Sequence, residues 1–211
     1  MSSRHPTRSA PRAPRRTVLA SMVLVGAAIL VAYHDESSAA PSPAPSSITA
    51  PPLSPRPPAR LSGEEDGVVP PGVTIFEDEY PAVAKLSPDL RRALRSAAAD
   101  ASKDGVTLLV KSGWRSRAYQ NELLREAVSK YGSVARAARW VATADTSPHV
   151  SGDAVDVGPS SAAAWLAKHG ATYGLCQIYR NEPWHYELRL QATDRGCPPL
   201  YADPTRDPRM H

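Results

Sequence analysis

Apolar residues recur with a regular period only in the second part of the chain, from about residue 72. A period of three to four predicts amphipathic helices, and short apolar runs bounded by Gly, Pro or Ser predict strands. The expected helices span residues 88–102, 117–131, 133–142 and 160–169. The expected strands span residues 106–111, 154–157, 175–179 and 184–190. Because helices come mainly before strands, this order predicts an α+β domain with a small, mostly antiparallel sheet and flanking helices.

The predicted helix at residues 88–102 has clear signals at its start and along one face. Residues 87–89 (Ser-Pro-Asp) supply a capping hydroxyl, a proline at the first helical position and an acid in the first turn. Leu90 and Leu94 then lie on one stripe of the helix. We expect this stripe to face the core of the domain.

The N-terminal 40 residues combine a basic lead with an apolar run. Residues 17–33 are 17 residues without a charge and follow a lead that contains five Arg. This length lies between that of a signal-peptide core and that of a spanning helix. The segment is therefore expected to be a signal peptide cleaved near residues 38–40, or an anchor in the cytoplasmic membrane. Either interpretation places the rest of the chain outside the cytoplasm.

A proline-rich tract separates this segment from the periodic part of the chain. Of the 22 prolines, eight lie in residues 41–60, where most other residues are Ala, Ser and Arg. Such a composition favours extended polyproline II and forms no core. We therefore divide the chain into residues 1–39 (basic lead with signal peptide or anchor), 40–71 (disordered linker) and 72–211 (folded domain).

The charge distribution argues against a nucleic-acid-binding protein. The formal net charge is +4, but the first 40 residues carry five Arg and two acids. The rest of the chain has 20 basic and 19 acidic residues. Because the folded part is nearly neutral, it lacks the basic surface that binding to a phosphate backbone requires.

Both cysteines of the chain, Cys176 and Cys197, lie in the predicted domain. An even number of cysteines in an exported chain favours a disulfide, which would close a loop of about 20 residues. Two unpaired thiols are the alternative.

Residue types that bind metals occur in two segments that also carry turn signals. Residues 147–156 (SPHVSGDAVD) contain His149 and Asp156, with Gly152 allowing the chain to turn into a strand. Residues 182–186 (EPWHY) place His185 on a later strand. Two imidazoles and one carboxylate suit a catalytic zinc ion (Zn²⁺) with a fourth position open to water.

Two further residues complete a candidate hydrolytic site. Glu182 lies three residues before His185 and is placed to accept a proton from a water molecule. Arg115 follows a tight turn, Ser112-Gly113, and would supply a positive charge for a developing oxyanion. Taken singly, each of these signals is weak, because a lone His, Asp or Arg is more often a structural residue.

The joint pattern is similar to that of a known family. The order S-G-aromatic-R-S, then S-x-H-x-x-G-x-A-x-D, then E-x-W-H resembles the VanY-type zinc D-alanyl-D-alanine carboxypeptidases. These belong with the VanX-type dipeptidases to the Hedgehog/D,D-peptidase fold group. The resemblance covers about residues 85–190. It implies an α+β domain that acts on peptidoglycan stem peptides in the cell wall.

The resemblance also implies a role for each matching residue. His149, Asp156 and His185 match zinc ligands, Glu182 matches the catalytic base, and Arg115 matches the residue that stabilises the carbonyl oxygen. Residues expected on the substrate side are Ser147, Gln120 and Trp184. The expected reaction is removal of a terminal D-alanine from D-Ala-D-Ala. An L,D-carboxypeptidase, a peptidoglycan endopeptidase and a non-catalytic zinc-binding cell-wall module are the alternatives.

Overall fold

The computed structural model of this chain describes residues 62–210. The predicted signal or anchor segment and most of the predicted linker lie outside the described residues. Among residues 62–210, no helix combines the length and the apolar character needed to cross a membrane. The membrane anchor therefore stays a prediction.

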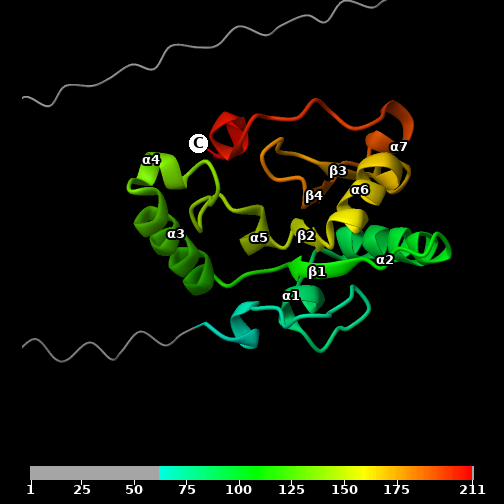
Figure 1. Cartoon of the computed structure of the whole chain (residues 1–211), viewed down its shortest axis with the longest axis horizontal. Coiled ribbons are helices and arrows are strands. Elements are labelled where there is room, and N and C mark those ends of the chain that lie inside the picture. Colours follow the sequence, from blue (N-terminus) through cyan, green and yellow to red (C-terminus); the bar gives the residue numbers. More distant parts are fainter. Residues whose placement is uncertain (1–61, 211) are drawn as a thin grey trace, which may run out of the picture. The chain divides into compact units, whose positions relative to one another are not determined.

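The described residues form an α+β domain, as the order of predicted elements indicates (Figure 1). The α-helices are α1 (Pro81–Ala84), α2 (Pro88–Lys103), α3 (Arg117–Tyr131), α4 (Val134–Ala137), α5 (Pro148–Ser151), α6 (Ser160–His169) and α7 (Ala192–Arg195). The strands are β1 (Leu109–Ser112), β2 (Ala154–Gly158), β3 (Leu175–Gln177) and β4 (His185–Leu188). Short 3-10 helices are η1 (Glu64–Asp66), η2 (Gly170–Tyr173), η3 (Pro204–Arg206) and η4 (Pro208–Met210).

The four strands form one antiparallel sheet in the order β1-β2-β4-β3. The register between β2 and β4 places Asp156 directly opposite His185, and Val155 opposite Tyr186. Directly opposed residues on neighbouring strands point to the same face of the sheet. One face of the two central strands therefore carries Asp156 and His185, and the other carries Val155 and Tyr186.

The main core lies between the apolar face of the sheet and helices α2 and α6. Leu90 and Leu94 of α2 are at most 1% exposed, which confirms the stripe predicted from the sequence. They belong to the same buried cluster as Val155, Val157 and Tyr186. In Figure 1, α3 and α4 lie on the side of the strands away from α2 and α6.

The predicted helix at residues 133–142 is wrong beyond its first turn, which is α4. Two carbonyl groups in the last turn of the predicted helix accept hydrogen bonds from distant side chains. The Arg139 carbonyl accepts from Asn181 Nδ2 at 2.8 Å, and the Ala142 carbonyl accepts from Gln120 Nε2 at 2.9 Å. Tertiary contacts thus override the helical propensity of this alanine-rich segment.

Strand bounds differ from the sequence-based ones by a few residues, whereas helices α2, α3 and α6 agree closely with them. Strand β1 begins at Leu109 rather than at residue 106, and β3 ends at Gln177 rather than at residue 179. Strand β4 covers only the middle of the expected 184–190 run. Apart from Lys111 at an irregularity in β1, these strands contain only residues that pair with a neighbour in the four-stranded sheet, and an apolar run by itself does not reveal where pairing stops.

The segment before residue 72 contacts the domain, although the predicted linker extends to residue 71. The Asp66 carbonyl accepts a hydrogen bond from the Ser116 amide at 2.8 Å. Gly67 lies so close to the backbone that an added Cβ would lie 2.1 Å from the Trp114 carbonyl oxygen, and its φ is +100°. Residues around η1 therefore brace the turn that leads to Arg115.

Candidate metal and catalytic site

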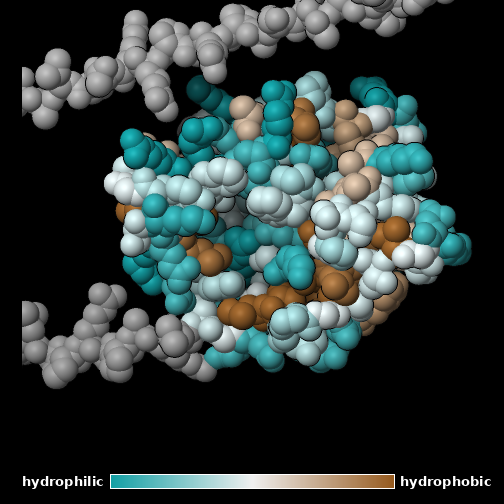
Figure 2. Space-filling model, in the orientation of Figure 1, coloured by the Kyte–Doolittle hydropathy of each residue, from teal (hydrophilic) through white to brown (hydrophobic). Residues whose placement is uncertain are grey.

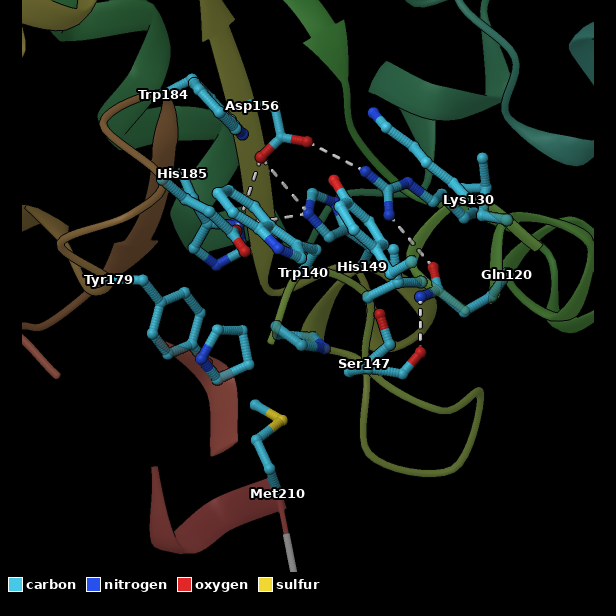
Figure 3. A pocket seen from close by; sticks show the side chains of 18 residues that line it. Gln120, Lys130, Trp140, Ser147, His149, Asp156, Tyr179, Trp184, His185 and Met210 are labelled. Atoms are coloured by element: carbon cyan, nitrogen blue, oxygen red, sulfur yellow. Dashed lines mark hydrogen bonds and ion pairs between the residues drawn. The ribbon is translucent and has the colours of Figure 1, made fainter. Parts of the chain in front are cut away.

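The three predicted metal ligands come from three separate elements and meet at one point (Figure 3). His149 lies on α5, Asp156 on β2 and His185 on β4. His149 Nε2 lies 3.3 Å from His185 Nδ1 and 3.5 Å from Asp156 Oδ1. His185 Nδ1 lies 3.2 Å from the same Asp156 oxygen. All three side chains are buried.

The turn between α5 and β2 delivers His149 to this point. Gly152 has a φ of +81°, and an added Cβ would lie 2.4 Å from the Lys85 carbonyl oxygen. A residue with a Cβ would be strained there, so glycine allows the turn that the sequence predicts and also the close approach to Lys85. Helix α5 is a single turn that begins at Pro148, where the sequence indicates a loop.

The hydrogen-bond partner of His149 determines which ring nitrogen faces the cluster. Nδ1 lies 2.8 Å from the Gly113 carbonyl oxygen, which can only accept, so Nδ1 carries the hydrogen. Burial, followed by the nearby Arg115 charge, lowers the pKa of His149. The imidazole is therefore neutral, and Nε2 presents a lone pair to Asp156 and His185.

His185 is held between two carboxylates. Its Nε2 donates to Glu187 Oε1 at 3.2 Å, and its Nδ1 faces Asp156. Burial lowers the pKa of His185, but the hydrogen bonds to Asp156 and Glu187 outweigh it and raise the pKa to about 9. A metal cation held by Nδ1 would therefore have to displace a proton from this ring.

Arg115 reaches three acceptors and braces the carboxylate of Asp156. Nε donates to Ser112 Oγ at 2.7 Å, Nη1 to Gln120 Oε1 at 3.1 Å and Nη2 to Asp156 Oδ2 at 2.9 Å. Burial raises the pKa of Asp156, but the hydrogen bond from His185 and the Arg115 charge outweigh it and hold this pKa well below its ordinary value. Asp156 is thus an anion, with Oδ1 directed at the two histidines.

Glu182 is a buried carboxylate beside the cluster. It lies in the turn between β3 and β4, and its Oε2 is 3.8 Å from His185 Nδ1. Its Oε1 has no hydrogen-bond partner among residues 62–210. Burial raises the pKa of Glu182 to about 7. This carboxyl group can therefore both accept and donate a proton near neutral pH.

A cavity of about 360 Å³ opens onto these residues. Figure 2 shows a hollow with hydrophilic side chains between the α3–α4 side and the strands. The three residues expected on the substrate side, Ser147, Gln120 and Trp184, all line this cavity. Ser147 Oγ is buried without a partner among the described residues, and Trp184 is 40% exposed. Gln120 is 1% exposed, and its amide bridges Arg115 and the Ala142 carbonyl.

Two parts of this site were missed by reasoning from the sequence. Glu187 follows His185 by two residues on β4, so the alternation of a strand could have placed both on one face. The C-terminal tail, residues 196–210, contributes Pro204 and Met210 to the cavity wall. No local pattern in the tail indicates this contact.

The predicted disulfide is confirmed, because Cys176 and Cys197 are bonded in the structure. Cys176 lies on β3 and is fully buried, whereas Cys197 lies near the start of the tail. The bond therefore ties the start of the tail to the edge strand of the sheet.

Comparisons with known proteins agree with the resemblance seen in the sequence. A D-alanyl-D-alanine carboxypeptidase from Enterococcus faecalis (strain ATCC 700802 / V583) is 31% identical over 127 residues. That alignment covers 48% of this chain and 46% of the relative, so the chain spans less than half of the relative's length.

Two solved structures are also similar. A variant of the vancomycin resistance D,D-pentapeptidase VanY from the VanB-type cassette, in complex with Zn(II), is 28% identical with a TM-score of 0.47. That match covers 49% of this chain and 72% of the other. The LdcB LD-carboxypeptidase is 24% identical with a TM-score of 0.49, over 63% of this chain and 72% of the other.

The match to a protein-family model shows to which family the chain belongs. The model of VanY, described as D-alanyl-D-alanine carboxypeptidase, matches residues 83–189, which is half of the chain. This range includes the three clustered residues, Glu182 and Arg115. The chain therefore belongs to the VanY family of D-alanyl-D-alanine carboxypeptidases.

Proposed function

We propose that this protein is a zinc metallopeptidase that removes the terminal D-alanine from peptidoglycan stem peptides ending in D-Ala-D-Ala. One observation carries the proposal: three potential ligand atoms meet beside a buried carboxylate oxygen that has no partner among the described residues. The family and the zinc complex of a similar VanY protein support it.

The cluster of His149, Asp156 and His185 fits a zinc ion. Tetrahedral ligands that lie about 2.0–2.1 Å from zinc are about 3.3–3.4 Å apart. The three facing atoms are separated by 3.2, 3.3 and 3.5 Å. Three protein ligands leave one position open, which is typical of catalytic rather than structural zinc sites.

Glu182 is proposed as the general base. When bound, zinc would lower the pKa of a water molecule and polarise a carbonyl group. Glu182 would take a proton from the attacking water and give it to the leaving amine. Its Oε1 is buried beside the cluster without a hydrogen-bond partner among the described residues, so it is placed to accept the proton of a water molecule.

Arg115 is proposed to stabilise negative charge on the scissile carbonyl oxygen. Each Nη atom carries two hydrogens, and the contacts with Gln120 and Asp156 each use one of them. The remaining N–H groups belong to a fixed guanidinium that lines the cavity. A preorganised donor of this kind favours the charge that develops in the transition state.

Ser147, Gln120 and Trp184 are proposed to position the substrate. The Ser147 hydroxyl is a buried donor in the cavity wall and suits the terminal carboxylate of a peptide. The half-exposed Trp184 ring would pack against the peptide, and Gln120 would set the direction of Arg115.

The site of action is proposed to be outside the cytoplasmic membrane, in the cell wall. The Cys176–Cys197 disulfide supports it, because structural disulfides persist in oxidising compartments. Anchoring by the N-terminal segment remains a prediction for residues outside the described part.

The decisive experiment compares the full-length chain with His149→Ala and with the control His169→Ala, a residue on α6 that contacts Trp165. We expect wild type and control to bind one zinc ion and to release D-alanine from a D-Ala-D-Ala pentapeptide. His149→Ala should lose both properties. Stoichiometric zinc in this variant would contradict the ligand set.

The same assay separates the alternative activities. Purified muropeptides ending in D,D or L,D bonds, and cross-linked ones, are incubated with the zinc-loaded chain and the products are weighed by mass spectrometry. Loss of one D-alanine from the pentapeptide supports the proposal. Cleavage restricted to an L,D bond or to a cross-link would replace it with the corresponding activity, and zinc binding without hydrolysis would indicate a binding module.

A further inference from the structure

The C-terminal tail returns to the site from outside the family match. The match ends at residue 189, and the tail comprises residues 196–210. In Figure 1 the tail, coloured orange to red, passes the end of the sheet and finishes near α4. Figure 3 shows Met210 on the Tyr179 side of the cluster. The tail therefore contributes to the surroundings of a site whose motifs lie elsewhere in the chain.

Glu187 connects this tail to His185. Its carboxylate is 1% exposed and accepts from His185 Nε2 through Oε1 at 3.2 Å. Arg209 donates to both oxygens, from Nη1 to Oε2 at 2.6 Å and from Nη2 to Oε1 at 3.2 Å. Arg189 donates only to Oε2, at 2.6 Å. Among the described residues, Arg209 is thus the arginine that reaches the oxygen facing His185.

We propose that Arg209 is a positioning residue that orients His185 through Glu187. A fork of two N–H groups across both oxygens fixes the plane of a carboxylate. A carboxylate fixed in this way holds the imidazole ring in one orientation and makes its other nitrogen a better ligand. The inference rests on the proposed function, because it takes His185 as a zinc ligand.

The tail is held so that Arg209 cannot easily turn away. Asp207 is fully buried, accepts from Arg209 Nε at 3.0 Å and accepts from the Tyr179 hydroxyl at 3.0 Å. The Tyr179 ring in turn packs on His185, with ring centroids 5.1 Å apart. The tail therefore supports His185 twice, through the Glu187 carboxylate and through an aromatic ring.

The backbone of the tail adds a second restraint. Tyr201 pairs with the segment after β3: its amide donates to the Ile178 carbonyl at 3.0 Å, and its carbonyl accepts from the Arg180 amide at 2.9 Å. The disulfide at Cys197 ties the start of the tail to β3. Arg209 is thus presented by a segment anchored at three places.

The test measures zinc affinity rather than activity. Arg209→Met in the full-length chain is compared with Arg206→Met, an exposed arginine of the same tail whose side chain has no hydrogen bond or ion pair within residues 62–210. The dissociation constant for zinc is obtained by competition with a chelator, under conditions where circular dichroism shows each variant folded. We expect about 10- to 100-fold weaker binding for Arg209→Met, the range typical of outer-shell partners, and no change for Arg206→Met.

Arg209→Lys provides a rescue test. A lysine places one compact charge near the carboxylate but lacks the fork that reaches both oxygens. We expect Arg209→Lys to bind zinc with an affinity between those of wild type and Arg209→Met. The visible absorption spectrum of its cobalt-substituted form should be closer to that of wild type than the spectrum of Arg209→Met is. If Arg209→Met does not fold, Arg209→Lys is compared with wild type alone. Weaker zinc binding by Arg209→Lys than by wild type supports the inference, and equal zinc affinity overturns it.

Separate results would overturn the inference and the proposed function. Zinc binding by Arg209→Met as tight as by wild type would overturn the inference and leave the proposed function intact. A lower unfolding midpoint with unchanged zinc affinity would show a purely structural role and overturn it as well. Failure of the wild-type chain to bind zinc would overturn the proposed function itself, and the inference with it.

Discussion

The two faces of strands β2 and β4 are both buried, but by different means. On one face, Val155 and Tyr186 pack against the leucines of α2. On the other face, Asp156, His185 and Glu187 are enclosed by hydrogen bonds and ion pairs. Neighbouring residues on the same strand therefore contribute to the molecule in opposite ways.

The two faces differ in what they contribute to the stability of the fold. Burial of an apolar side chain contributes about 1.5–3 kcal/mol, whereas a buried polar group costs free energy unless it has a partner. Glu182 has a carboxylate oxygen without a partner among the described residues, and its raised pKa shows the cost of ionising it there. The apolar face thus carries the stability, and the polar face is arranged for chemistry.

The largest effect is expected for Glu182→Gln, in the turn beside the polar face. Loss of the proposed base should slow D-alanine release by about 10²- to 10⁴-fold. Zinc content should stay the same, and the free energy of unfolding should stay equal or rise, because an unpartnered buried carboxylate is removed. Steady-state rates, metal analysis and urea unfolding measure the three quantities.

The exposed Glu126 on α3 is a matched control, and Glu126→Gln should resemble wild type in all three measurements. A wild-type rate in Glu182→Gln would refute its role as base. A large loss of stability in that variant would instead show that Glu182 holds the fold, and the contrast between the faces would break down.

For Leu94→Ala, in the core against the apolar face, we expect a loss of stability without a loss of catalytic rate, which is the reverse of Glu182→Gln. This side chain is 1% exposed in the main core, so truncation should lower the free energy of unfolding by about 2–5 kcal/mol. Zinc affinity and turnover of the folded fraction should be unchanged. Leu190→Ala, at a position 67% exposed, should change stability by less than about 0.5 kcal/mol. Equal losses in the two variants would contradict the assigned core.

A somewhat smaller effect is expected where the tail joins the sheet, for Cys197→Ser. The disulfide spans 21 residues, and opening a loop of that length should cost roughly 3 kcal/mol of stability in the chain-entropy model. Wild type treated with a reductant should unfold at the same urea concentration as the variant. A thiol assay on untreated wild type should detect no free thiol, and two reactive thiols would disprove the bond in solution.

The smallest effect is expected for Asp207→Asn and depends on pH. Burial raises the pKa of Asp207, but hydrogen bonds from Arg209 and Tyr179 outweigh it and lower the pKa below its ordinary value of 3.8. Since the folded state favours the ionised form, Asp207 stabilises the protein above about pH 4. That stability is lost as the pH falls through the lowered pKa.

Asp207→Asn should therefore cost about 1.5–3 kcal/mol at pH 7, typical of hydrogen bonds to a charged group, and less in acid. Urea unfolding at pH 7, 5 and 3.5 in the presence of a chelator measures the difference. Asp194→Asn, on the exposed side of α7, serves as the control. A constant difference between wild type and Asp207→Asn at all three pH values would contradict the pairing of Asp207.

Local patterns were enough to predict the residues that cluster in the site. His149, Asp156, His185 and Glu182 stand in short motifs with turn signals, and the structure brings all four together. Glu187 could have been found from strand alternation, because it shares a face with His185. Arg209 could not, since 22 residues separate it from Glu187 and no periodicity links them.

The sequence by itself determined the α+β class, helices α2, α3 and α6, the family and the residue types of the site. Helical period, caps and short motifs are local properties, so they can be read without knowledge of the fold. Only the tertiary structure decided where α4 ends, which atoms of the three clustered residues face one another, and that the tail supports His185. These features depend on contacts between distant segments, and such contacts leave no periodic signal along the chain.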